Sequence, residues 1–180
     1  MMLHKDVESV LLSQEKLEKI VKSLAKQIEK DYNDKEFMMV GLLKGSVAFM
    51  ADLMKRVNLD FSIDFMVASS YGSGTESSGR VKIVSDLTLP VQGKDVLVVE
   101  DIIDSGNTLN FVMNYLMTKG ANSVKVCTLC DKPSRRKVPL VPDYCGAEIP
   151  DEFIVGYGLD YAEKYRNLPY IGILKRSVYE

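Results

Sequence analysis

The sequence has little of what several classes of protein require. It contains one histidine, three cysteines and no apolar run long enough to cross a bilayer as a helix. Its 23 lysine and arginine side chains are balanced by 25 acidic ones, and the formal net charge is −2. A chain with this balance carries no basic field as a whole, so we expect neither general nucleic-acid binding nor a membrane partner.

The cysteines are too few and poorly placed for a disulfide framework or a zinc site. Cys127 and Cys130 have C-x-x-C spacing, but they fall in an apolar run in which strand alternation would put them on opposite faces. No second cysteine pair or nearby histidine completes a zinc site. We expect buried, reduced thiols in a chain without a secretory leader, and hence a cytoplasmic location. His4, in a polar N-terminal arm, is expected to be solvated.

The stretch from Val96 to Thr108 has the most informative pattern. It begins with four apolar residues, which predict a strand buried on both faces, as in a parallel sheet covered by helices. We expect that strand to end at Glu100 and Asp101. The chain then turns through residues 104–108 into a segment with helical spacing of apolar residues, so a strand, a short loop and a helix follow one another.

This arrangement suits an anion, because the N-terminus of a helix offers unpaired N–H groups. The loop lacks the lysine and spacing of a Walker A motif and the three glycines of a dinucleotide fingerprint. The two acids before it would repel phosphate unless hydroxyls or a divalent cation stood between them. The pattern therefore favours a phosphorylated sugar with a hard metal such as Mg²⁺ over an ordinary strand-to-helix turn with solvated acids.

The remaining segments predict further alternation of strands and helices. Ser13 can cap an amphipathic helix, and a Lys44-Gly45 loop follows an apolar strand. The expected strands span residues 37–43, 60–68, 81–87 and 124–129, the second having faces of different polarity, and a helix spans 47–57. Between two of these strands lies a Gly- and Ser-rich loop from Ser69 to Arg80, which we interpret as a lid over the site rather than a plain hairpin connection.

Residues 100–108, Glu-Asp-Ile-Ile-Asp-Ser-Gly-Asn-Thr, resemble the phosphoribosyl-pyrophosphate (PRPP) signature of type I phosphoribosyltransferases. The closest resemblance is to the hypoxanthine-guanine branch of purine salvage, in its bacterial form, and it extends from about Val40 to Arg166. It implies an α/β fold with a mainly parallel central sheet flanked by helices, a small hood and a flexible lid. We expect one domain over 1–180, with a core at about 35–140 and a hood from the N-terminal segment and about 141–180.

The resemblance also implies roles for single residues at the phosphoribosyl end of the site. Asp104 would be the general base that takes a proton from the purine. Glu100 and Asp101 would hold the ribose hydroxyls directly or through Mg²⁺, and Asp160 would join the metal shell. The loop that would bind the 5′-phosphate consists of Asp104, Ser105, Gly106, Asn107 and Thr108.

Other residues are assigned by the same resemblance to the two remaining parts of the site. Lys44, Gly45 and Arg166 would bind pyrophosphate, with a cis peptide before the lysine. Lys132 would bond the exocyclic oxygen of a 6-oxopurine. The other purine-binding residues would be Phe153, Ile154 and Asp160, and the lid would start at Ser70 and Tyr71.

The implied reaction is transfer of 5-phosphoribosyl from PRPP to N9 of hypoxanthine or guanine, giving IMP or GMP and pyrophosphate, with Mg²⁺ as cofactor. Xanthine stays open as a third base, and a homodimer or homotetramer is expected. Three alternatives remain: a pyrimidine or adenine phosphoribosyltransferase, a PRPP-sensing regulator that binds RNA or DNA, and a non-catalytic Mg²⁺-nucleotide binder. A regulator should show a basic face or an added domain, which this sequence lacks.

Overall fold

A computed structural model of the chain describes residues 3–70 and 81–180. None of the helices in these two ranges combines the length and apolarity of a membrane span. The elements follow in the order β1 (Val7–Leu12), α1 (Gln14–Tyr32), β2 (Phe37–Leu42), α2 (Val47–Met54), β3 (Ser62–Ser70), β4 (Val81–Ser85), β5 (Asp95–Ile103), α3 (Asn107–Thr118), β6 (Ser123–Asp131), a 3₁₀ turn (Pro133–Arg135), β7 (Tyr144–Glu148), β8 (Ile154–Val155), β9 (Ile171–Leu174) and α4 (Arg176–Tyr179).

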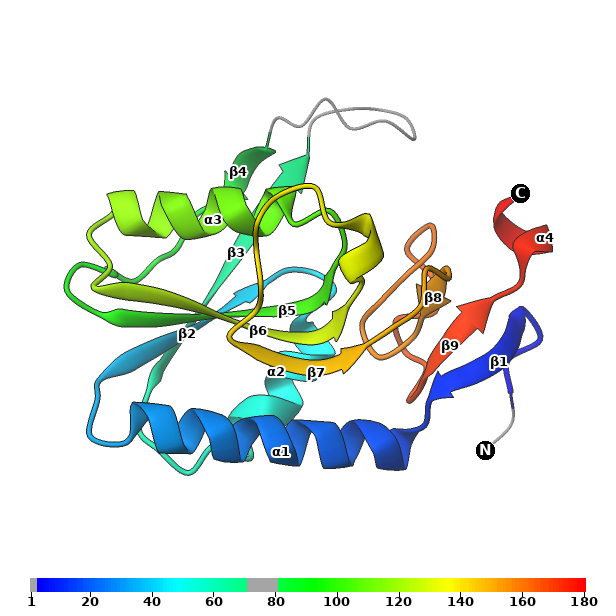
Figure 1. The fold of residues 1–180 in the computed structure, drawn as a ribbon, viewed down its shortest axis with the longest axis horizontal. Helices are drawn as coiled ribbons and strands as arrows, with labels where there is room; N and C mark the ends of the chain where they lie inside the picture. Colours follow the sequence, from blue (N-terminus) through cyan, green and yellow to red (C-terminus); the bar gives the residue numbers. More distant parts are fainter. Residues whose placement is uncertain (1–2, 71–80) are drawn as a thin grey trace.

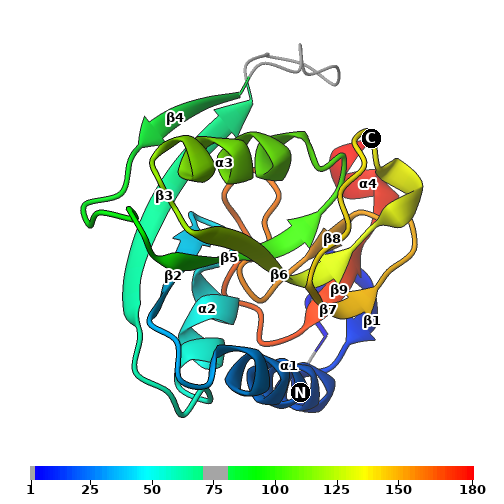
Figure 2. The ribbon, with the colours of Figure 1, turned by 60° about the vertical axis from the view of Figure 1, so that its left-hand side comes forward.

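Two sheets organise the molecule. The larger has the strand order β4-β3-β2-β5-β6-β7, and its strands are parallel except for β4, which pairs antiparallel with β3. Helices α1 and α2 cover one face and α3 covers the other (Figure 2). The smaller antiparallel sheet, β1-β9-β8, lies beyond the carboxyl ends of the parallel strands (Figure 1). The predicted α/β fold with a mainly parallel, helix-flanked sheet is confirmed.

The central strands are buried on both faces because their alternate residues enter two different cores. In β2, Phe37 and Met39 pack with α1 and α2, whereas Met38 and Val40 pack on the α3 side. All four side chains are fully buried. Burial on both faces explains why these strands are continuous apolar runs rather than alternating ones. The buried state expected for Cys127 and Cys130 is likewise confirmed.

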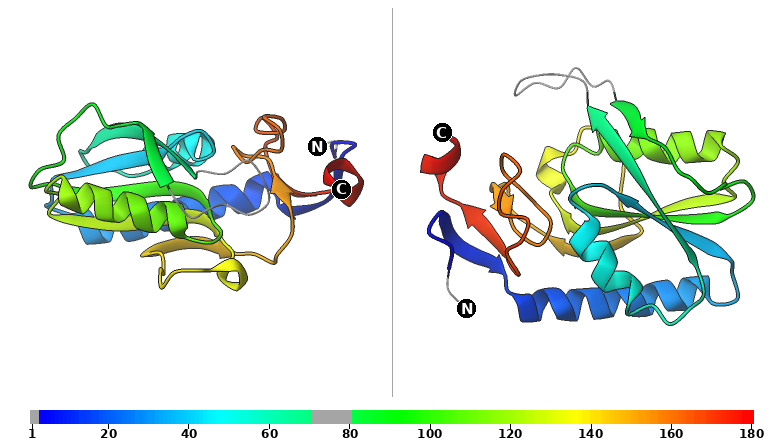
Figure 3. Two further views of the ribbon diagram at one scale, coloured as in Figure 1. Left: turned by 90° about the horizontal axis from the view of Figure 1, so that it is seen from above. Right: turned by 180° about the vertical axis from the view of Figure 1, so that it is seen from behind.

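Two local predictions were wrong, and one strand was missed. The strand expected to end at Glu100 continues to Ile103, because its ladder with β6 runs on as far as Asp131. Residues 7–12, for which the sequence predicted no element, form β1, which pairs with β9 at the far end of the chain (Figure 3). His4 is therefore not simply solvated: its ring packs edge-on against Tyr165 at a centroid distance of 5.3 Å.

The strand β3 buries the face that carries its polar residues. Asp64 is 8% exposed and Met66 fully buried, whereas Ile63, on the apolar face, is 39% exposed. The Asp64 carboxylate accepts bonds from the backbone N–H groups of Thr88 and Leu89 at 2.7 and 2.8 Å. Asp64 thus ties the segment after β4 to the sheet.

Candidate active site

The candidate site forms where the carboxyl ends of β2, β5 and β6 meet the loops of the small sheet (Figure 1). Parallel strands bring their carboxyl ends to one edge, which is where open α/β sheets bind ligands. The loop after β2 brings Lys44 and Gly45, the end of β5 brings the acids, and β6 ends next to Lys132. Residues far apart in the sequence therefore converge at this edge.

The loop from Asp104 to Thr108 has the geometry of an anion site. Gly106 is the residue before α3 and has a φ of 81°, a left-handed conformation that favours glycine. Gly106 supplies no side-chain cap to this helix N-terminus. The N–H of Asn107 donates to Ser105 Oγ at 3.4 Å, a long bond that an anion can replace. A cavity of about 110 Å³ lies over the loop and is lined by Glu100, Ile102, Ile103, Asp104, Ser105, Gly106, Thr108 and Leu109.

Glu100 and Asp101 are successive residues of β5, so their side chains point to opposite faces of the sheet. Glu100 lines the loop cavity, and its Oε2 atom is buried with no hydrogen-bond partner among residues 3–70 and 81–180. Burial and the Asp101 carboxylate raise the pKa of Glu100 well above its ordinary value. Such a buried, unpartnered carboxylate is a site for a cation or a hydroxyl donor.

Asp101 faces the loop after β2. A Cβ placed on Gly45 would overlap the Asp101 carboxylate, and one on Gly158 would overlap the Gly45 carbonyl, so three chain segments are in close contact here. The Leu43–Lys44 peptide is cis, as the family resemblance implied. Burial raises the pKa of Asp101 to about 6, although the N–H of Ile102 and the Arg166 guanidinium favour its charged form.

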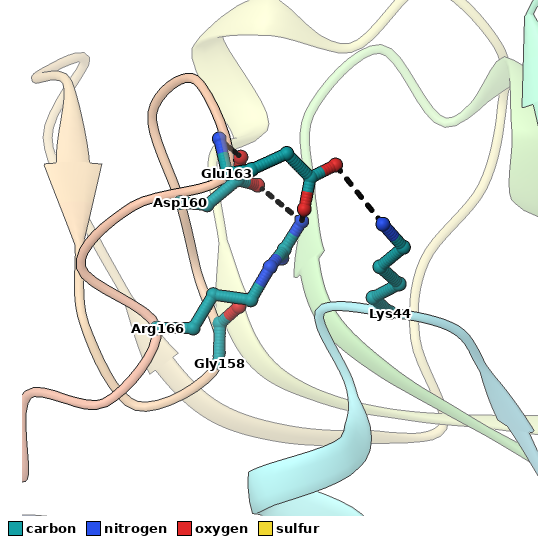
Figure 4. A network of polar contacts seen from close by, with 5 residues as sticks. All are labelled: Lys44, Gly158, Asp160, Glu163 and Arg166. Carbon is teal, nitrogen blue, oxygen red and sulfur yellow. Dashed lines mark hydrogen bonds and ion pairs between the residues drawn. The ribbon is translucent and has the colours of Figure 1, made fainter.

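Arg166 and Lys44 meet through acidic side chains at the mouth of the site (Figure 4). Arg166 pairs with Asp160 at 2.9 Å and donates to the carbonyl of Gly158 at 2.8 Å. Glu163 lies 3.3 Å from Arg166 and 3.2 Å from Lys44, so one carboxylate contacts both cations. The three predicted residues Lys44, Arg166 and Asp160 are thus brought together, and Glu163 was missed.

Lys132 is buried beside the segment that leads to Phe153. It is 6% exposed, and its Nζ donates to the carbonyl of Glu152 at 2.6 Å. Burial lowers the pKa of Lys132, and the carboxylates of Asp104 and Asp151 oppose that shift. Phe153 is 37% exposed, whereas Ile154 is buried in β8. An ammonium donor and an exposed aromatic ring therefore sit on adjoining parts of the fold.

Arg136 is a second residue that sequence reasoning missed. It forms a close ion pair with the buried Asp131, and its side chain is 12% exposed. A Cβ on Gly106 would lie 3.1 Å from Arg136 Cδ, so the side chain backs the phosphate loop. Its Nε and Nη1 atoms are buried and have no hydrogen-bond partner in the described part of the chain. No sequence signal separates Arg136 from its neighbour Arg135, which is half exposed.

The acids do not form a ready-made metal cage. Over the described ranges, no three Asp, Glu, His or Cys side chains are gathered as metal ligands, so Glu100, Asp101 and Asp160 do not converge on one point. Their oxygen donors and the unpartnered Glu100 Oε2 nevertheless suit Mg²⁺, which is typically held by one or two carboxylates plus substrate oxygens. Of the expected lid, Ser70 is the last residue of β3, and Tyr71 with the rest of the loop lies outside the described residues.

Comparison with known proteins gives one consistent result. Residues 9–162 match the family model for the phosphoribosyl transferase domain. The hypoxanthine-guanine phosphoribosyltransferase of Staphylococcus epidermidis is 52% identical over 177 residues, which is 98% of this chain and 99% of that protein. The Bacillus subtilis protein of the same name is 51% identical over 179 residues, or 99% of each.

The crystal structure of a Staphylococcus aureus hypoxanthine phosphoribosyltransferase superposes with a TM-score of 0.95 at 51% identity, covering 98% of this chain and 96% of that one. Fold, site geometry and sequence identity agree. This chain belongs to the phosphoribosyltransferase family, within its hypoxanthine-guanine branch.

Proposed function

We propose that this protein transfers the 5-phosphoribosyl group of Mg²⁺-PRPP to N9 of hypoxanthine or guanine, forming IMP or GMP and releasing pyrophosphate in purine salvage. One observation carries the proposal. A phosphate-type loop, the unpartnered carboxylate of Glu100 and the buried amine of Lys132 beside Phe153 stand at one sheet edge in a chain of this family.

The phosphoribosyl end is held by β5 and the loop that follows it. We assign the 5′-phosphate to the N–H groups and hydroxyls of residues 104–108 at the start of α3. Glu100 and Asp101 bind the ribose hydroxyls or the metal ion. Asp160 orients Arg166 at the edge of this metal site. Glu100 and Asp101 would hold Mg²⁺ with substrate oxygens, and the ion would supply positive charge that offsets the charge of the pyrophosphate.

During the reaction the bond from C1′ to the pyrophosphate oxygen breaks and a bond from C1′ to N9 forms. Positive charge develops on the ribose, as in glycoside cleavage, and the buried carboxylates next to it stabilise that charge. Lys44 and Arg166 neutralise the charge of the leaving pyrophosphate. To do so, they give up their ion pairs with Glu163 and bind the pyrophosphate instead. Asp104 accepts the proton that the purine loses.

The purine is recognised by a charge and a ring. Lys132 Nζ has three N–H donors, of which one bonds Glu152, and another can bond the exocyclic oxygen of a 6-oxopurine. Phe153 provides a face for stacking, and Ile154 provides backbone polar groups at the base edge. An adenine amino group in place of the oxygen would face a cation, which disfavours adenine.

We further propose that the chain acts as one domain and assembles as a homodimer or homotetramer in the cytoplasm. Its three free thiols support a reducing compartment. Since β7 pairs with β6 in the large sheet, the proposed core extends to Glu148, and the hood consists of the small sheet with its loops.

Pyrophosphate release tests the function. The purified protein with Mg²⁺ and PRPP should release pyrophosphate with hypoxanthine and guanine, but not with adenine or orotate, and xanthine measures the breadth of the site. Release only with adenine or a pyrimidine, or with no base, would reject the proposal. Release that needs no Mg²⁺ would reject the metal assignment alone.

The general base is tested separately. Asp104→Asn should reduce turnover by about 10²–10⁴-fold, the range for a lost general base, while PRPP still binds. Asp151→Asn is the matched control, since both carboxylates lie near Arg135, at 3.8 and 3.1 Å, and it should leave turnover near wild type. Unchanged turnover of Asp104→Asn would exclude Asp104 as the base.

A further inference from the structure

Three aromatic rings meet at the purine end of the site. Phe153 and Tyr179, from the C-terminal α4, are stacked with centroids 4.9 Å apart and planes 26° from parallel. Tyr161 meets Phe153 at 5.4 Å and 90°, and it lies 6.4 Å from Tyr179. The ring we assign to purine stacking therefore already carries one stacked neighbour within its own chain.

The three separations show how the two tyrosines lie around Phe153. They form a triangle whose angle at Phe153 is acute, so Tyr161 and Tyr179 do not lie on opposite sides of the Phe153 ring. Tyr179 covers one face of Phe153 and Tyr161 its edge. Phe153 nevertheless remains 37% exposed, so part of its surface is accessible to a ligand.

The chain around Tyr179 is fastened to the same strands that hold Phe153. At the end of β9, the N–H of Leu174 donates to the carbonyl of Phe153 at 2.8 Å. Lys175 then anchors the start of α4, its N–H donating to the carbonyl of Asp6 at 3.0 Å and its Nζ to that of Lys5 at 2.7 Å. The start of α4 is thus fixed against the segment that precedes β1 and against the Phe153 segment.

We propose that Tyr179 is a positioning residue for the purine, supporting Phe153 from behind so that the opposite face of that ring stacks on the base. This inference rests on the proposed function. An aromatic ring held by a stacked neighbour loses less rotational freedom on binding a ligand, so its stacking contributes more to affinity. The C-terminal α4 is then part of the base site although it does not touch the reacting atoms.

An alternative position of Tyr179 predicts the opposite change in purine binding. If the Tyr179 ring occupied the position of the base, removing it would open the site and improve purine binding. Support from behind requires that its removal weaken purine binding. The sign of the change in KM for the purine therefore separates the two.

Steady-state kinetics provide the first test. Tyr179→Ala should raise KM for hypoxanthine and guanine roughly 3- to 10-fold, the range that corresponds to one aromatic stacking contact. KM for PRPP and kcat should stay within about twofold, because other residues bind PRPP. Tyr179→Phe keeps the ring and the stack, and is the matched control that should behave as wild type.

The other outcomes overturn the inference. An unchanged or lower KM for the purine in Tyr179→Ala would exclude support from behind. A higher KM for both substrates together with a lower kcat would also exclude it, because that pattern indicates general damage. Wild-type protein inactive with purines would instead be a failure of the proposed function, and it would be recognised before any variant was made.

A binding measurement keeps the inference testable if Tyr179→Ala turns over poorly. The chain contains nine tyrosines but no tryptophan, so Phe153→Trp introduces a single tryptophan, which can be excited selectively at the stacking position. We expect GMP to quench its emission as the base stacks on the indole. Adding Tyr179→Ala should raise the Kd for GMP by a similar 3- to 10-fold, whereas adding Tyr179→Phe should not. Equal Kd values in all three proteins would contradict the inference.

Discussion

Gly45 and Asp101 are so close that a side chain at position 45 has no room: a Cβ there would lie 2.6 Å from Asp101 Cγ and overlap its carboxylate. No φ in the left-handed range accounts for this glycine, so the close approach itself requires it. The contact joins the loop proposed for pyrophosphate to the acid proposed for the ribose and metal. The contact between the Gly45 backbone and the Asp101 carboxylate thus sets the distance between the pyrophosphate site and the ribose site.

Gly45→Ala should therefore damage activity more than stability. Displacing the loop or the carboxylate by about an ångström is expected to lower kcat/KM for PRPP by about 10²-fold, while unfolding in urea should show a loss of about 1–3 kcal/mol from overpacking.

The control is Gly93→Ala. A Cβ at Gly93 meets no atom within 4 Å, but its φ of 73° is unfavourable for alanine. It should cost about 1–2 kcal/mol in stability and leave kcat/KM unchanged. A Gly45→Ala enzyme with normal kcat/KM for PRPP would show that the loop tolerates displacement.

Asp64 should make the folded state sensitive to acid. Its burial raises the carboxyl pKa, but bonds from the N–H groups of Leu89, Phe65 and Thr88 outweigh that effect, and the net pKa lies below the usual 3.8. A carboxyl with a lowered folded-state pKa stabilises the protein above its unfolded pKa, and that contribution is lost as the pH falls through the folded-state pKa.

Asp64→Asn should accordingly be less stable than wild type at pH 7, by about 1–3 kcal/mol for the weakened bonds, with the difference shrinking below pH 4. Urea unfolding at several pH values measures both. Asp60→Asn, at an exposed position of the same segment, should follow the wild-type pH profile. A difference between Asp64→Asn and wild type that grows toward low pH would contradict the assigned sign.

Much of the fold can be predicted from the sequence because it depends on local patterns. Continuous apolar runs predict β2 and β5, Ser13 caps α1 by accepting from the N–H of Lys16, and Gly120 ends α3 with a φ of 86°. The phosphate loop is also local, and its residue types suit an anion at a helix N-terminus.

What sequence reasoning missed depends on partners far away in the chain. β1 buries only Val7 and Leu12, so it shows no strand periodicity, and its pairing with β9 spans most of the chain. Glu163 looks like any exposed acid until the fold places it between Lys44 and Arg166. Similarly, Asp64 reads as an exposed residue of a polar face, and the N–H groups of Thr88 and Leu89 beyond β4, together with that of Phe65, make its burial favourable.

Glu163 should compete with PRPP for its own two cations. Its carboxylate contacts Lys44 and Arg166, which we assign to pyrophosphate, so a substrate has to displace it. Because the Glu163 carboxylate is largely exposed, its ion pairs are worth little, and Glu163→Gln should lower KM for PRPP only about two- to fivefold, with kcat retained. Glu36→Gln, which breaks a comparable surface pair with Lys94, should leave KM unchanged. A higher KM for PRPP in Glu163→Gln would mean that Glu163 organises the cations instead of competing for them.

The ion pair between Arg136 and Asp131 should be strongly coupled, because both side chains are largely buried behind the phosphate loop. Arg136→Met leaves a buried carboxylate unpaired and Asp131→Asn leaves a buried guanidinium unpaired, and each should cost about 3–5 kcal/mol of unfolding free energy. The double variant leaves no buried charge unpaired. Its loss of unfolding free energy should therefore be clearly smaller than the sum of the losses in the two single variants.

A double-mutant cycle measured by urea unfolding checks this coupling. The control cycle uses Arg56 and Glu18, a surface pair at 3.1 Å whose glutamate is 66% exposed, and its coupling should not exceed about 1 kcal/mol. Equal coupling in the two cycles would mean that water screens Arg136 and Asp131 as effectively as it screens a surface pair. That result would mean that Arg136 does not help to shape the phosphate loop, since a hydrated guanidinium is not packed against the loop.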